Sequence, residues 1–166
     1  PAEPLPVLRS RIVTDRSASH LIRSIFSTFR DRPAFGREVF LGGGRSRSRF
    51  EWKTYGQCYE NMRRLPGALL ARGVRPGAFV GFCTENSSFS ALELYFGLIC
   101  GNYVVVPLSD HLSAAHATHI VAEAKLECMF LSAATAPRWR AIVNAVNAGG
   151  GEGCNVSGAA TATKTV

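Results

Sequence analysis

The stretch "AFVGFCTENSSFSALELYFGLICGNYVVVPLSDHLSAAHATHIVAEAKLECMFLS", residues 78–132, decides the fold. Three short apolar runs in it, AFVGFC, YVVVPL and ECMFLS, alternate with two segments of helical periodicity. This order of strands and helices predicts parallel strands joined by right-handed crossovers, with helices covering the sheet. The predicted fold class is therefore α/β, with a partial three-layer parallel sheet and flanking helices.

Both helices of this stretch have start and stop signals. Ser87 or Ser88 is the expected N-cap of the first helix, and Gly101 is its expected stop. Ser113 is expected to cap the second helix. The inward positions predicted for the first helix are Phe89, Leu92, Phe96 and Ile99.

The twenty residues 89–108 approach the length of a transmembrane helix and contain one charged residue, Glu93. The pair Gly101-Asn102 divides them, which favours a helix followed by a buried strand over a membrane span.

The preceding sequence predicts a helix, a β-hairpin and a second helix. Helical spacing of apolar residues runs from Ser19 to about Arg30, and the β-prone runs PAFGREVF and RFEWKTY flank the Gly/Ser/Arg stretch LGGGRSRS. Thr54 and Gln57 form a T-x-x-Q capping box at the start of the second helix. Pro66 is expected to kink or break that helix, and Gly73 to cap its end.

The two ends of the chain predict little regular structure. Residues 1–16 contain three prolines and suggest an extended arm. After a short helical pattern at residues 139–146, the Gly-, Ala- and Thr-rich residues 147–166 predict a disordered low-complexity tail. The chain is thus divided into an arm at 1–16, an ordered unit at 17–146 and a tail at 147–166.

Charge and cysteine usage narrow the function classes. The 166 residues suffice for one domain, and the net charge of +7 is concentrated in residues 1–75, which carry +9. The arginines there are scattered without a recognition motif, so nucleic-acid binding is not expected. Neither a signal peptide nor a regular cysteine spacing is visible, which predicts a non-secreted protein with buried thiols. The five cysteines are Cys58, Cys83, Cys100, Cys128 and Cys154.

Asp110 and Glu85 each follow a predicted strand, where open α/β sheets bind ligands. Neither has a nucleophile or base nearby in the sequence, so turn or cap roles are favoured for both. His111, His116 and His119 cluster without a complementary ligand set, which favours a solvated helix face over a metal site.

Other motifs have simpler explanations. Gly42, Gly43 and Gly44 lack the strand-loop-helix context of a phosphate loop, and a hairpin loop is favoured. Phe50, Trp52 and Tyr55 are interpreted as core packing rather than as a stacking platform. The N-x-S matches at Asn86 and Asn155 are interpreted as chance, and so is the phosphate-loop-like segment Ser157–Lys164.

Taken in order, residues 50–112 resemble the N-terminal part of long-chain fatty-acid CoA ligases, which belong to the adenylate-forming, AMP-binding superfamily. The resemblance rests on the Phe-x-Trp-x-Thr-Tyr pattern (50–55), Leu-x-x-Gly-Val-x-x-Gly (70–77), Glu-Asn (85–86) and Val-Pro-Leu followed by Asp and Leu (106–112). It extends over about residues 17–132. Residues 17–146 are accordingly expected to form an incomplete N-terminal subdomain of an AMP-binding domain.

The resemblance implies ATP-dependent activation of a fatty acid to an acyl-adenylate, followed by transfer of the acyl group to coenzyme A. It implies ATP, Mg²⁺ and coenzyme A as cofactors of the complete enzyme, and peripheral membrane association would suit its lipid substrate. The expected location is the cytoplasmic side, at the endoplasmic reticulum or another organelle membrane.

The family's phosphate loop, its adenine and ribose motifs and its C-terminal catalytic lysine have no counterpart in this sequence, and Thr163 stands where a Pro-Lys ending requires Pro. No catalytic, cofactor-binding or metal-binding residue can therefore be assigned, and no cofactor is expected for this chain. Pro66 and the segment Ser109-Asp110-His111 are smaller departures from the family pattern.

The leading hypothesis is a truncated or incomplete long-chain fatty-acid CoA ligase that is inactive alone. Two alternatives stay open: a non-catalytic α/β interaction module, and a basic protein that binds nucleic acid or an anionic membrane.

Overall fold

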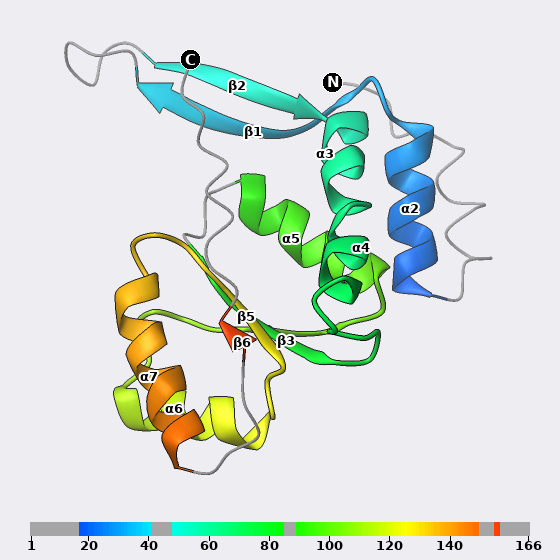
Figure 1. Cartoon of the computed structure of the whole chain (residues 1–166). Coiled ribbons are helices and arrows are strands. Elements are labelled where there is room, and N and C mark those ends of the chain that lie inside the picture. Colours follow the sequence, from blue (N-terminus) through cyan, green and yellow to red (C-terminus); the bar gives the residue numbers. More distant parts are fainter. Residues whose placement is uncertain (1–16, 41–47, 85–88, 150–154, 157–166) are drawn as a thin grey trace.

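The computed structural model of the chain describes residues 17–40, 48–84, 89–149 and 155–156. From β3 onward, strands and helices alternate as the sequence predicts (Figure 1). The elements are α2 (Ala18–Thr28), β1 (Pro33–Phe40), β2 (Ser48–Thr54), α3 (Tyr55–Met62), α4 (Leu65–Leu70), β3 (Phe79–Cys83), α5 (Phe89–Cys100), β4 (Val104–Pro107), α6 (Ala114–Glu123), β5 (Cys128–Leu131), α7 (Ala136–Ala148) and β6 (Asn155–Val156).

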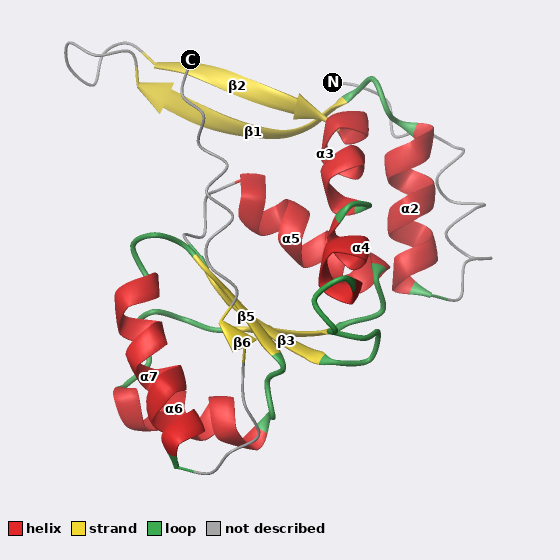
Figure 2. Ribbon diagram, in the orientation of Figure 1, coloured by secondary structure: helices red, strands yellow, loops and turns green. Residues whose placement is uncertain are grey.

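A parallel sheet lies at the centre of the fold (Figure 2). The strand order is β4-β3-β5-β6, and Val80 of β3 lies opposite Val105 of β4 and Cys128 of β5. A helix connects each strand to the next one in the chain, as parallel pairing requires. The carboxyl ends of β3, β4 and β5 therefore meet at one edge of the sheet.

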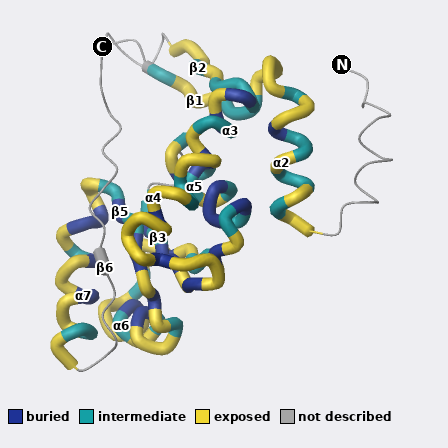
Figure 3. Tube along the Cα trace, turned by 45° about the vertical axis from the view of Figure 1, so that its right-hand side comes forward, coloured by how far each residue is buried: buried dark blue, intermediate teal, exposed yellow. Residues whose placement is uncertain are grey.

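Two apolar clusters, one on each face of the sheet, create the three layers (Figure 3). On one face, α6 and α7 pack Val121 and Trp139 into the same cluster as Met129 of β5. On the other face, Leu69 of α4 and Leu98 of α5 pack in a cluster with Val80 of β3. The predicted three-layer α/β architecture is confirmed.

A third cluster joins α2, α3 and α5 to the hairpin. Phe26, Cys58 and Met62 are buried in it, and the Phe26 ring meets Tyr55 edge-on at 5.1 Å between centroids. The strands β1 and β2 pair antiparallel, which confirms the predicted hairpin. Residues 41–47, with Gly42–Gly44, lie outside the described residues.

The predicted capping box of α3, the helix break before Pro66 and the glycine cap after α4 are confirmed. The Thr54 hydroxyl accepts from the Gln57 backbone N–H at 3.2 Å, and the Gln57 side chain accepts from the Thr54 N–H at 2.9 Å. The predicted helix is broken after Met62, and Pro66 lies in the first turn of α4, where its missing N–H costs no helical bond. Gly73 has φ +83, and the Val74 N–H bonds back to the Leu69 carbonyl, which closes a Schellman cap.

The helix α5 ends at Cys100, so Gly101 follows its last residue as predicted. Asn102 adopts the left-handed conformation, with φ 60, and the Tyr103 N–H bonds to the Leu98 carbonyl. Gly101 is required for a different reason, since a Cβ there would lie 2.7 Å from the Tyr103 ring.

The buried face of α5 differs from the prediction. The predicted inward residues Phe89, Leu92, Phe96 and Ile99 are half-buried. The helix lies between the sheet on one side and α2 and α3 on the other, so apolar residues surround it and their spacing marks no single buried face. The residues that are buried are Ala91, Glu93, Gly97, Leu98 and Cys100.

The C-terminal region contains more structure than predicted. The helix α7 extends beyond residues 139–146 at both ends, and Asn155–Val156 pairs parallel with Cys128–Met129, within the segment predicted to be disordered. A two-residue strand has no period-two pattern that a sequence could reveal. The predicted arm at 1–16 and the rest of the tail lie outside the described residues.

The apolar stretch 89–108 is divided between the helix α5 and the strand β4. Within the parts of the chain that the structure describes, no helix combines the length and apolarity needed to cross a membrane.

Candidate functional site

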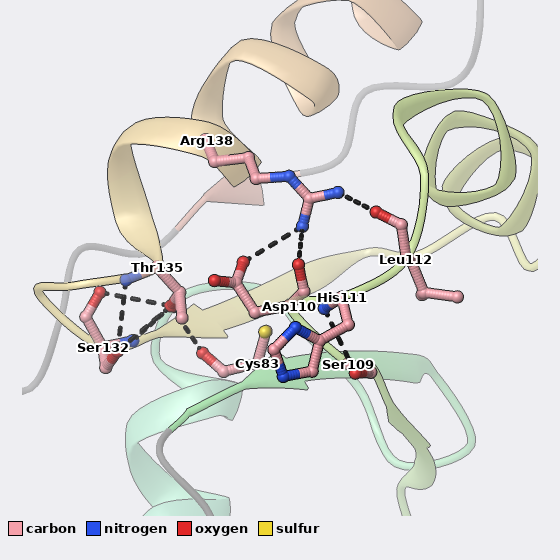
Figure 4. A network of polar contacts seen from close by, with 8 residues as sticks. All are labelled: Cys83, Ser109, Asp110, His111, Leu112, Ser132, Thr135 and Arg138. Carbon is pink, nitrogen blue, oxygen red and sulfur yellow. Dashed lines mark hydrogen bonds and ion pairs between the residues drawn. The ribbon is translucent and has the colours of Figure 1, made fainter.

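The carboxyl edge of the sheet, where open α/β folds bind ligands, collects polar side chains from four segments (Figure 4). Cys83 ends β3, the loop 109–112 follows β4, and Ser132 follows β5. Thr135 and Arg138 come from the start of α7. Of the two candidates predicted at this edge, Asp110 is present there, whereas Glu85 lies outside the described residues, as does Asn86.

Thr135 links two strands to the start of α7. Its buried hydroxyl donates to the Cys83 carbonyl at 2.7 Å and accepts from the Ser132 backbone N–H at 3.1 Å. The Ser132 N–H also reaches the Cys83 carbonyl, at 3.2 Å. These bonds hold the ends of β3 and β5 together. The Thr135 hydroxyl is therefore already hydrogen-bonded within the protein.

Arg138 holds the loop that carries Asp110. Its guanidinium donates to the Asp110 carboxylate at 3.1 Å and to the backbone carbonyls of Asp110 and Leu112. The His111 N–H donates to the Ser109 hydroxyl at 3.2 Å, and the His111 side chain is exposed. Asp110 is thus an ion-pair and turn residue, and the guanidinium of Arg138 is already bonded to oxygens of the protein itself.

The thiol at this edge is poorly suited to nucleophilic chemistry. Cys83 is 1% exposed, and burial raises the pKa of its thiol, with a further contribution from the Asp110 carboxylate. Since the thiolate is the reactive form of cysteine, a raised pKa and burial leave Cys83 inert.

The described residues at the carboxyl edge offer no ready partner for a triphosphate or Mg²⁺. His116 and His119 are exposed on α6, and within the described ranges no group of three or more His, Cys, Asp or Glu side chains is placed to hold a metal. The Arg138 charge, which could have met a phosphate, is bonded to three protein oxygens. The phosphate-loop-like segment Ser157–Lys164 lies outside the described residues.

A second polar cluster was not predicted. Glu93, 8% exposed, accepts from the Lys53 ammonium at 2.7 Å and from the Asn61 amide at 3.0 Å. Burial raises the pKa of the neighbouring Cys58 thiol to about 11, and the Glu93 charge adds to that effect. The available signal was the one charged residue in the mostly apolar stretch 89–108, because a buried carboxylate needs a partner.

The interpretation of Phe50 and Trp52 as core packing is wrong. Their exposed fractions are 60% and 58%, because none of the described elements covers the face of the two-stranded hairpin on which they lie. Tyr55 does pack as expected, against Phe26. Asn86 lies outside the described residues, and Asn155 lies in β6, where its backbone pairs with that of Cys128.

Comparisons with known proteins agree with the predicted resemblance. A family model described as "AMP-binding enzyme" matches residues 25–160. Long chain acyl-CoA synthetase 1 of Arabidopsis thaliana is 34% identical over 86 residues, which are 49% of this chain and 12% of that protein.

Solved structures share the fold. An adenylation-carrier didomain of carboxylic acid reductase from Segniliparus rugosus, in complex with AMP, matches with a TM-score of 0.69 and 17% identity over 93% of this chain and 27% of that chain. Fatty acyl CoA synthetase of Mycobacterium tuberculosis matches with a TM-score of 0.56 and 24% identity over 66% of this chain and 21% of that chain.

The chain spans 12% of its curated relative and about a quarter of these solved chains. The stretch that the family model covers nevertheless contains the hairpin and every strand of the parallel sheet. On that match, the chain belongs to the family of AMP-binding enzymes.

Proposed function

We propose that this chain forms the N-terminal part of an ATP-dependent long-chain fatty-acid CoA ligase and supplies scaffold rather than catalytic groups. The observation that carries the proposal is the 34% identity to a long-chain acyl-CoA synthetase within the matched family. In such a ligase the fatty-acid carboxylate displaces pyrophosphate from ATP, and the coenzyme A thiol then displaces AMP from the acyl-adenylate. Mg²⁺ offsets the triphosphate charge when it is bound.

The polar contacts support a scaffold role. Thr135 and Arg138 bind protein acceptors, which fixes the ends of β3 and β5 and the loop after β4. In this proposal, other parts of the ligase supply the groups that hold the nucleotide and coenzyme A. From the lipid substrate, we also propose that the ligase works on the cytoplasmic side of an organelle membrane.

The experiment is fatty-acid-dependent exchange of labelled pyrophosphate into ATP, measured on this chain with Mg²⁺ and palmitate or oleate. We expect no exchange above a reaction without protein, because the described residues offer no site for the triphosphate. Exchange that requires both the chain and a fatty acid would overturn the scaffold assignment.

A further inference from the structure

We draw no further inference here: the strongest candidate, the exposed aromatic face that Phe50 and Trp52 form on the hairpin β1–β2, rests on exposure alone, and nothing in the structure shows what covers that face in a chain that spans a small part of its relatives.

Discussion

The buried carboxylate of Glu93 ties the hairpin and α3 to α5 through Lys53 and Asn61. Replacing Lys53 by Met leaves that carboxylate without its counter-charge, so the free energy of unfolding should fall by about 2 kcal/mol. Urea unfolding followed by circular dichroism measures the change. The control is Arg49→Met, which removes an exposed partner of Glu51 and should cost under about 0.5 kcal/mol. Equal effects of the two variants would contradict the anchoring role of Glu93.

The Cys58 thiol makes stability depend on alkaline pH. Its pKa is raised from 9.0 to about 11 in the folded chain, so the folded state keeps a proton that the unfolded state loses in that interval. The contribution of Cys58 to the free energy of unfolding should therefore be constant at neutral pH and fall by about 2 kcal/mol between pH 9 and 11. Buried Cys83 and Cys100, whose pKa values are also raised, add to the fall. Cys58→Ala should make the curve shallower, and an unchanged curve would contradict this assignment.

At the scale of the elements, two glycines beside the α4–α5 contact differ in whether a side chain would fit. A Cβ at Gly101 would lie 2.7 Å from the Tyr103 ring and 2.9 Å from Pro66, whereas nothing lies within 4 Å of a Cβ at Gly67. Gly101→Ala should destabilise the chain by about 1–3 kcal/mol through overpacking. Gly67→Ala, inside α4, should stabilise it by about 0.5–1 kcal/mol. Thermal unfolding of the two variants should shift Tm in opposite directions, and shifts of the same sign would contradict the packing described for Gly101.

The elements also show which parts of the fold a sequence can predict. Caps and turns at Thr54, Gly73 and Ser113 depend on residues within five positions of each other, and they were predicted correctly. The buried face of α5 was predicted wrongly, since it depends on which elements cover the helix from two sides. The small residues at its closest contacts, such as Gly97, carry no hydrophobic signal.

For the whole molecule, the parallel sheet and its carboxyl edge were predictable, whereas the ion pairs formed by the charged side chains were not. Asp110 was placed correctly at that edge, but its partner Arg138 is 28 residues further along the chain. Lys53 and Glu93 are 40 residues apart. No local pattern records such pairs, so the sequence alone could not show that Asp110 and Glu93 already have cationic partners.

The central claim, that this chain is the scaffold of a fatty-acid-activating ligase, is tested most directly by a segment exchange. The 86-residue stretch of Arabidopsis long chain acyl-CoA synthetase 1 that aligns with this chain is replaced by its counterpart from this chain. Fatty-acid-dependent pyrophosphate exchange by the chimera should stay within about tenfold of the parent enzyme, since a change of 1.4 kcal/mol in the barrier is tenfold in rate. The control carries the corresponding stretch of the carboxylic acid reductase, which shares the fold at 17% identity with this chain, and should lose more. A chimera that folds as a monodisperse protein but shows no exchange, or no more than the control, would contradict the claim.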